Sequence, residues 1–140
     1  KGGWGDERDG DAVVLKGHGG KSKLATPDAV FARTQIEVLK EGSYILWVRC
    51  RDYASKEPAT RKFKVEVGGI EATREFGTHR TEGYAWQNGG SFELKKGFLP
   101  LRLVDSAAWY GRCDKLLLTT DAAFVPKGKG GRGNVEHKSY

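Results

Sequence analysis

The segment SYILWVRCRDY, residues 43–53, contains the strand that decides the fold. Side chains of a β-strand alternate between its two faces. One face of this strand would hold Tyr44, Leu46, Val48 and Cys50. The other face would hold Ile45, Trp47, Arg49 and Arg51. The segment therefore predicts a strand with one face in a hydrophobic core and one outer face that carries a tryptophan and two arginines.

The same alternation recurs along the chain in short runs that are rich in β-branched and aromatic residues. These runs predict strands at residues 12–16, 31–39, 43–51, 61–67, 71–76, 84–87, 91–94, 98–104 and 114–120. Turn residues separate them at VGGIE, QNGG and KKG, and KEGS at residues 40–43 is typical of a tight hairpin. Since no amphipathic helix interrupts the pattern, the expected fold is an all-β antiparallel sandwich with jelly-roll topology.

Length and charge limit the range of functions. A chain of 140 residues makes one domain, and none of its apolar runs is long enough to cross a bilayer. We expect a sandwich over residues 11–125, an N-terminal extension at 1–10 and a Gly/Lys-rich linker or tail at 126–140. The formal net charge of +6 favours polyanionic partners without choosing among them. Without an initiator methionine or signal peptide, we expect a mature product or a module cut from a longer polypeptide.

Basic residues on two further strands extend the outer-face prediction. In RKFKVEV, residues 61–67, Lys62 and Lys64 alternate with apolar residues, and in FLPLRLV, residues 98–104, Arg102 does the same. If these strands neighbour residues 43–51, one sheet face gathers Trp47, Arg49 and these three basic residues. Arginine offers a planar fork of donors that suits carboxylate and sulfate groups.

Large aromatic residues outside the predicted core are a second group of candidate ligand-binding residues. Aromatic rings in loops reduce solubility unless they pack against the protein or are covered by a bound ligand. The chain has Trp4, Tyr53, Tyr84, Trp86, Trp109 and Tyr110 in such positions. Flat rings stack on the apolar faces of sugars, although Trp47 or Trp86 could equally serve packing. We expect Trp109 and Tyr110 to form the edge of a cleft if their loop converges with those of Tyr53 and Trp86.

No catalytic or metal-binding constellation is recognisable in the sequence. His18, His79 and His137 lack partners at metal-ligand spacing, and GHGGKS at residues 17–22 lacks the spacing of a phosphate-binding loop. Asp114 near Arg112 favours a structural ion pair over an acid and base couple. Cys50 and Cys113 permit either one disulfide or two buried free thiols, and the sequence leaves both open.

The order of several segments resembles a known family. GSYILWVRCRDY, RKFKVEVGG, GYAWQNGGSFELKKGFLPLRLVD and GRCDKLLLTTDAAFVP follow one another between about residues 10 and 126. Together they resemble a bacterial β-sandwich accessory domain similar to carbohydrate-binding modules, a galactose-binding-like jelly roll beside polysaccharide-degrading enzymes. The resemblance implies a secreted or periplasmic binding module without catalysis, a catalytic domain on the same polypeptide and a packing role for the cysteine of GRCD. It requires no cofactor and leaves room for a structural calcium ion, although no Asp-x-Asp-x-Asp run is present.

The residues and the resemblance together predict a non-catalytic carbohydrate-binding module. It would target a tethered enzyme to an extracellular polysaccharide, expected to be anionic (sulfated or uronic) because the body of the chain is basic. The expected ligand-binding residues are Trp47, Arg49, Arg51, Tyr53, Lys62, Lys64, Trp86, Arg102, Trp109, Tyr110 and Arg112. A structural accessory domain that packs on a catalytic domain is the first alternative. Nucleic-acid binding through aromatic and basic side chains is the second alternative, which the sequence disfavours, and no membrane partner is expected.

Overall fold

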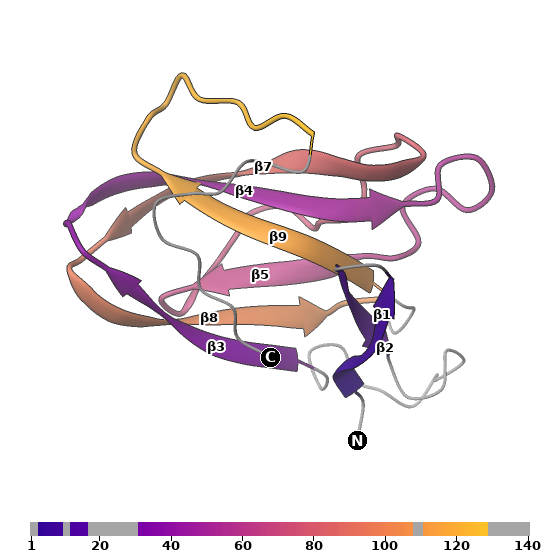
Figure 1. Ribbon diagram of the computed structural model, residues 1–140, viewed down its shortest axis with the longest axis horizontal. Helices are drawn as coiled ribbons and strands as arrows, with labels where there is room; N and C mark the ends of the chain where they lie inside the picture. The colour runs from indigo at the N-terminus through magenta and orange to yellow at the C-terminus, as the bar shows by residue number, and fades with distance from the viewer. Residues whose placement is uncertain (1–2, 10–11, 17–30, 108–110, 129–140) are drawn as a thin grey trace.

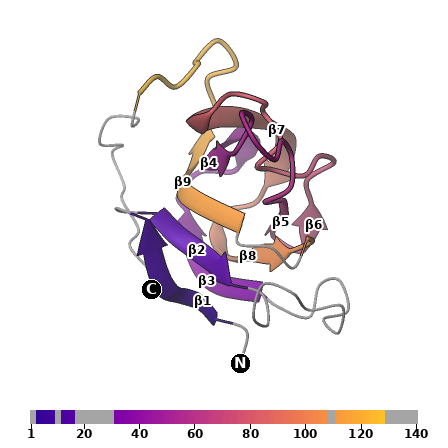
Figure 2. The same cartoon turned by 90° about the vertical axis from the view of Figure 1, so that its right-hand side faces the viewer.

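Two antiparallel sheets pack face to face in the computed structural model, which describes residues 3–9, 12–16, 31–107 and 111–128 (Figures 1 and 2). Sheet A has the strand order β1-β2-β9-β4-β7, and sheet B has the order β3-β8-β5-β6. The strands are β1 (Gly3–Asp9), β2 (Ala12–Lys16), β3 (Phe31–Val38), β4 (Gly42–Asp52), β5 (Phe63–Val67), β6 (Ile70–Glu71), β7 (Gly83–Leu94), β8 (Gly97–Asp105) and β9 (Gly111–Thr119). The described residues contain no helix. The prediction of an all-β antiparallel sandwich with jelly-roll topology is confirmed.

The hydrophobic core lies between the two sheets and follows the predicted alternation. From β4 of sheet A, Leu46, Val48 and Cys50 are fully buried. From sheet B, the inward face of β5 contributes Phe63, Val65 and Val67, which are also fully buried. Because every second residue of these strands is used for the core, the residues between them are directed to the two outer faces of the sandwich.

Two connections that look like hairpins cross between the sheets instead. The segment KEGS was expected to form a hairpin, but β3 pairs with β8 in sheet B whereas β4 pairs with β7 and β9 in sheet A. The link between β7 and β8 at residues 95–96 crosses in the same way. A connection of three residues spans about 10 Å, which equals the spacing of stacked sheets. The hairpin prediction is therefore wrong, because a short polar turn serves a corner as well as a hairpin.

Two strand boundaries also differ from the sequence-based expectation. Only Glu71 of the predicted strand at 71–76 belongs to a strand, β6, after which the chain turns. Phe76 is nevertheless buried, and its backbone exchanges hydrogen bonds with Phe63 at 2.8 and 3.1 Å. The expected strands at 84–87 and 91–94 are a single strand, β7, because the glycines of QNGG form a bulge within it.

Gly89 explains why β7 can continue through the QNGG segment. The pairing of Ile45 with Ser91 shifts to the pairing of Trp47 with Asn88, so an additional residue of β7 is accommodated opposite Leu46. A Cβ atom on Gly89 would lie 2.7 Å from Cδ2 of Leu46 and 3.0 Å from Cζ of Phe76. The core thus packs directly against the backbone at this bulge.

The Gly89→Ala variant should be less stable than the native protein by about 1–3 kcal/mol, because the new methyl group overpacks the core. Gly42→Ala is the matched control, since a Cβ atom there meets nothing within 4 Å. We expect the control to stay within about 0.5 kcal/mol of the native value. Urea denaturation followed by tryptophan fluorescence measures both, and equal effects of the two substitutions would contradict this packing.

Cys50 and Cys113 lie directly opposite each other on β4 and β9, and both are buried free thiols. The Cys50 thiol lies 3.2 Å from the carbonyl oxygen Oε1 of Gln87, to which it donates. Burial raises the pKa of Cys50 from 9.0 to about 12 and raises the pKa of Cys113 well above 9.0. Of the two alternatives that the sequence left open, the structure contains the free thiols.

The folded protein should therefore resist thiol reagents at pH 8 and lose stability at alkaline pH. Both thiols should react in denaturant without any reductant, on the order of 100-fold faster than in the native protein. A thiol whose pKa is raised by folding stabilises the fold fully below the unfolded pKa, so the free energy of unfolding should fall as pH rises from about 9 to 12. A thiol count of zero in denaturant would indicate a disulfide and contradict the structure.

Candidate functional site

The predicted basic surface is divided between the two outer faces of the sandwich. Because β4 belongs to sheet A while β5 and β8 belong to sheet B, Arg49 lies in a different layer from Lys64 and Arg102 (Figure 2). The expectation of one face that gathers all these residues is wrong. Alternation gave the correct face of each strand, but it carries no information about which strands are neighbours.

The predicted basic residues on this side of the sandwich are paired with carboxylates: Lys64 and Arg102 lie on strands of sheet B, and Lys62 directly precedes β5. The distances are 3.3 Å for Lys62–Glu75, 3.5 Å for Lys64–Glu71 and 3.1 Å for Arg102–Glu66. Partly exposed pairs of this kind contribute little to stability. They do, however, cancel most of the positive charge on which the anion-binding prediction for these three residues depended.

Four arginines surround two tyrosine rings on sheet A, at the end of the sandwich where β4 finishes. The guanidinium carbons of Arg51, Arg61 and Arg112 lie 4.6, 4.5 and 5.2 Å from the centre of the Tyr53 ring. Arg49 and Arg51 lie 4.9 and 5.8 Å from the centre of the Tyr84 ring. We call Arg49, Arg51, Tyr53, Arg61, Tyr84 and Arg112 the arginine–tyrosine cluster.

Pairing within sheet A explains how the cluster forms. Arg51 on β4 lies opposite Tyr84 on β7, and on the other side of β4 the chain pairs with β9, where Arg112 adjoins Cys113. These side chains therefore share the outer face of three adjacent strands. Arg61 joins them from the loop that leads into β5. Guanidinium groups stacked on aromatic rings gain cation–π energy.

The chain after β9 returns over the outer face of sheet A. Residues 121–128 arch above β7 in both views (Figures 1 and 2). The carbonyl oxygen of Gly128 accepts hydrogen bonds from Nε of Arg49 at 3.1 Å and from Nε1 of Trp86 at 2.9 Å. Arg49 also forms an ion pair with Asp114 at 2.5 Å. Asp114 was expected to pair with Arg112, and it pairs with Arg49 beside a register irregularity between β4 and β9.

A buried carboxylate holds the loops beside the cluster. Asp52, the last residue of β4, is fully buried and accepts hydrogen bonds from the backbone N–H groups of Tyr53, Ala59 and Arg80 at 2.7–2.9 Å. Ala59 and Arg80 have φ values of 56° and 60° in the left-handed region. Both residues that bear this backbone strain thus donate to Asp52, whose carboxylate offsets the cost of their conformation.

Two further side chains connect the same loops. Oε1 of Gln87 accepts from the backbone of Gly77 at 2.8 Å and Thr78 at 3.1 Å. The carboxylate of Glu82 accepts from the backbone N–H of Ser55 at 2.8 Å, and this bond lowers the pKa of Glu82. The loop after β4 and the loop before β7 are therefore linked to each other and to sheet A. They form a fixed rim for the arginine–tyrosine cluster.

The structure brings together five of the predicted ligand-binding residues. They are Arg49, Arg51, Tyr53, Trp86 and Arg112. Trp47 shares their face but is half-buried, with no hydrogen-bond partner for its buried indole N–H among the described residues. Lys64 and Arg102 belong to the other sheet, and Lys62 directly precedes β5 of that sheet. Trp109 and Tyr110 lie outside the described residues.

Arg61 and Tyr84 were not among the expected ligand-binding residues, although Tyr84 is one of the large aromatic residues that the sequence placed outside the core. Tyr84 shares a face with Trp86 two residues later, so the alternation of β7 could have revealed it. Arg61 precedes β5 in phase with the buried residues Phe63 and Val65, which indicates an inward position. No sequence signal could therefore have placed it beside Tyr53.

Neither a metal cluster nor a membrane span is present in the part of the chain that the structure describes. No three His, Cys, Asp or Glu residues among positions 3–9, 12–16, 31–107 and 111–128 are grouped so that they could hold a metal ion. A structural calcium ion remains a prediction. None of these residues forms a helix long and apolar enough to cross a membrane.

Comparison with solved structures identifies the fold. A family 35 carbohydrate-binding module from Clostridium thermocellum matches with a TM-score of 0.52 and 17% identity, over 67% of this chain and 73% of that one. The module from Paenibacillus barcinonensis matches with a TM-score of 0.53 and 16% identity, over 79% and 90% of the two chains. This chain has the fold of a family 35 carbohydrate-binding module. The resemblance stated from the sequence is confirmed at the level of the fold.

A third match shows the fold of family 35 modules within a larger protein. The GH26-CBM35 β-(1,4)-mannanase of Podospora anserina matches with a TM-score of 0.55 and 16% identity, over 83% of this chain but only 26% of that one. No protein-family model and no curated protein matches the sequence. The comparisons therefore establish the family 35 fold and leave the ligand to be argued from the residues.

The Ala59→Gly variant should be more stable than the native protein. Glycine relieves about 1–2 kcal/mol of strain in the left-handed conformation. It costs about 0.5–1 kcal/mol, because the unfolded chain gains conformational entropy, so the free energy of unfolding should rise by about 0.5–1 kcal/mol. Ala54→Gly in the same loop is the control, because Ala54 does not have a positive φ. It should lower stability in urea denaturation. A loss of stability in both variants would contradict the conformation at Ala59.

Proposed function

We propose that this chain is a non-catalytic carbohydrate-binding module that binds acidic polysaccharides through its arginine–tyrosine cluster. The main observation behind this proposal is that at least two guanidinium groups contact each of the rings of Tyr53 and Tyr84 at the end of the sandwich. The family 35 fold supports the carbohydrate-binding part of the proposal. The cluster supports the acidic preference.

The cluster offers both kinds of contact that an acidic sugar needs. Tyrosine rings stack on the apolar C–H faces of a sugar, while guanidinium N–H groups donate to its carboxylate or sulfate oxygens. The side chain of Arg49 is only 15% exposed, so its charge acts in partly desolvated surroundings. Arg49 pairs with Asp114, and Arg61 pairs with Glu57. Arg51 lies beside both tyrosine rings and Arg112 lies beside Tyr53, so we assign the leading ligand contacts to Arg51 and Arg112.

The proposal places the module beside a catalytic domain on the same polypeptide and outside the cytoplasm. The match to a GH26-CBM35 mannanase supports this arrangement, because in that protein a module of this fold accompanies an enzyme. The proposed role is to hold the enzyme close to its polysaccharide, which raises the effective concentration of substrate.

Affinity electrophoresis tests the proposal. The 140-residue chain should be retarded in native gels that contain sulfated or uronic polysaccharides such as carrageenan or alginate, and not by single- or double-stranded DNA. Arg51→Gln should weaken the retardation constant about tenfold, because it removes a charge-assisted hydrogen bond. Lys96→Gln, which removes one charge at the opposite end of sheet A, should leave it within about twofold.

Several outcomes would contradict the proposal. Retardation that survives about 0.5–1 M salt unchanged would contradict the electrostatic part, since charges are strongly screened there. Equal retardation by every polyanion, DNA included, would show that the basic residues attract polyanions without selectivity. Absence of retardation by any glycan would favour a structural accessory domain instead.

A further inference from the structure

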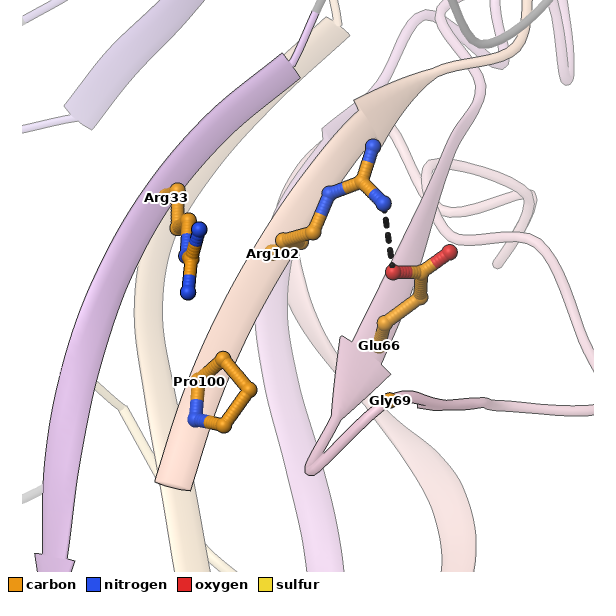
Figure 3. A pocket seen from close by; sticks show the side chains of 5 residues that line it. All are labelled: Arg33, Glu66, Gly69, Pro100 and Arg102. Atoms are coloured by element: carbon orange, nitrogen blue, oxygen red, sulfur yellow. Dashed lines mark hydrogen bonds and ion pairs between the residues drawn. The ribbon is translucent and has the colours of Figure 1, made fainter. Parts of the chain in front are cut away.

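A shallow hollow lies on the outer face of sheet B, on the opposite side of the sandwich from the arginine–tyrosine cluster. It has a volume of about 320 Å³ and is lined by Arg33, Glu66, Gly69, Pro100 and Arg102 (Figure 3). Arg33 on β3 lies opposite Arg102 on β8, and Arg102 lies opposite Glu66 on β5. The hollow is therefore built on three adjacent strands of a packed sheet, which holds its lining in fixed register.

Hydrogen-bond donors and an acceptor converge on this hollow. Nη1 of Arg102 donates to Oε2 of Glu66 at 3.1 Å, which leaves further oxygen lone pairs and N–H groups of this pair for a ligand. Arg33 forms no hydrogen bond or ion pair with any other described residue. In Figure 3 its guanidinium group extends along the sheet toward the ring of Pro100. An apolar ring flanked by donors and a carboxylate suits a ligand that combines C–H faces with hydroxyl groups.

Exposed aromatic rings stand at both ends of the hollow. Phe98 is 68% exposed and lies on the same face of β8 as Pro100, while Phe31 is 48% exposed and stacks under the guanidinium of Arg102 at 4.3 Å. Phe31 lies opposite Val104, so six residues of β8 separate the two rings, or about 20 Å. Such a length exceeds a single sugar ring and fits an extended chain.

The charge of this face differs from that of the cluster on sheet A. The outward-facing ionisable residues of sheet B are Arg33, Lys64, Arg102, Glu37, Glu66 and Glu71. Three positive and three negative charges give no net charge, whereas the charged residues of the arginine–tyrosine cluster are all arginines, and their carboxylate partners Asp114 and Glu57 come from outside the cluster. An uncharged ligand therefore meets no unfavourable field on sheet B.

We propose that the outer face of sheet B is a second saccharide-binding site, which takes an uncharged polysaccharide chain along the line from Phe31 to Phe98. The arrangement disfavours a protein partner, because protein interfaces concentrate apolar residues at the centre and charge at the rim. Here Arg33, Glu66 and Arg102 occupy the centre, and the rings stand at the ends. The site extends the proposed function to a second ligand class and uses none of the residues of the cluster.

Affinity electrophoresis of the full chain in agarose-free gels that contain galactomannan, arabinoxylan or mixed-linkage β-glucan tests this site. At least one of these uncharged polysaccharides should retard the protein, and retardation should persist in about 0.5 M salt because no net charge is involved. Phe98→Ala and Arg33→Gln should each weaken the retardation constant by about fivefold to tenfold. Phe124→Ala and Arg74→Gln are the matched controls, because both residues are exposed and lie away from this face.

The outcomes separate this inference from the proposed function. Absence of retardation by all three uncharged polysaccharides overturns the second site, even if acidic polysaccharides still bind. Retardation that Arg51→Gln abolishes and Arg33→Gln leaves intact also overturns it, because binding then belongs to sheet A. If acidic polysaccharides fail to bind but Arg33→Gln weakens binding of an uncharged one, the second site stands and the acidic preference fails.

Discussion

The carboxylate of Asp52 is the interaction on which the candidate site depends. A buried charge must be compensated by hydrogen bonds, and Asp52 accepts three of them from backbone N–H groups of two different loops. These bonds impose left-handed backbone at Ala59 and Arg80 and fix the direction in which the chain leaves β4. Tyr53 follows immediately, so its ring is held where three guanidinium groups can reach it.

The two stacked sheets then decide how the remaining side chains are shared. Alternation sends every second residue to the core, and the crossings at residues 39–41 and 95–96 place consecutive strands in different layers. As a result the basic residues do not form one surface. Sheet A gathers arginines around tyrosines and pairs Arg49 with Asp114, whereas sheet B places arginines and carboxylates side by side near exposed phenylalanines. The ligands that we propose for the two faces therefore differ in charge.

Much of this architecture could be predicted from local sequence. Alternation correctly assigned Leu46 and Val48 to the core and Arg49 to an outer face, since that pattern depends only on strand geometry. Strand neighbours could not be predicted, because a turn such as KEGS fits a hairpin and a corner equally well. The sequence could not predict the pairing of Lys64 with Glu71 or the position of Arg61 beside Tyr53 for the same reason. Both depend on contacts between strands and loops whose pairing the sequence does not show.

The most direct test of the proposal that the two faces bind different classes of ligand is a nuclear magnetic resonance titration of the ¹⁵N-labelled chain. The titration is followed at the arginine Nε–H signals. An alginate oligosaccharide should shift the signals of Arg51 and Arg112, and a galactomannan oligosaccharide should shift those of Arg33 and Arg102. The two sets should respond independently when both ligands are present. If both oligosaccharides shift the same set of arginines, the faces do not differ in ligand class and the account is contradicted.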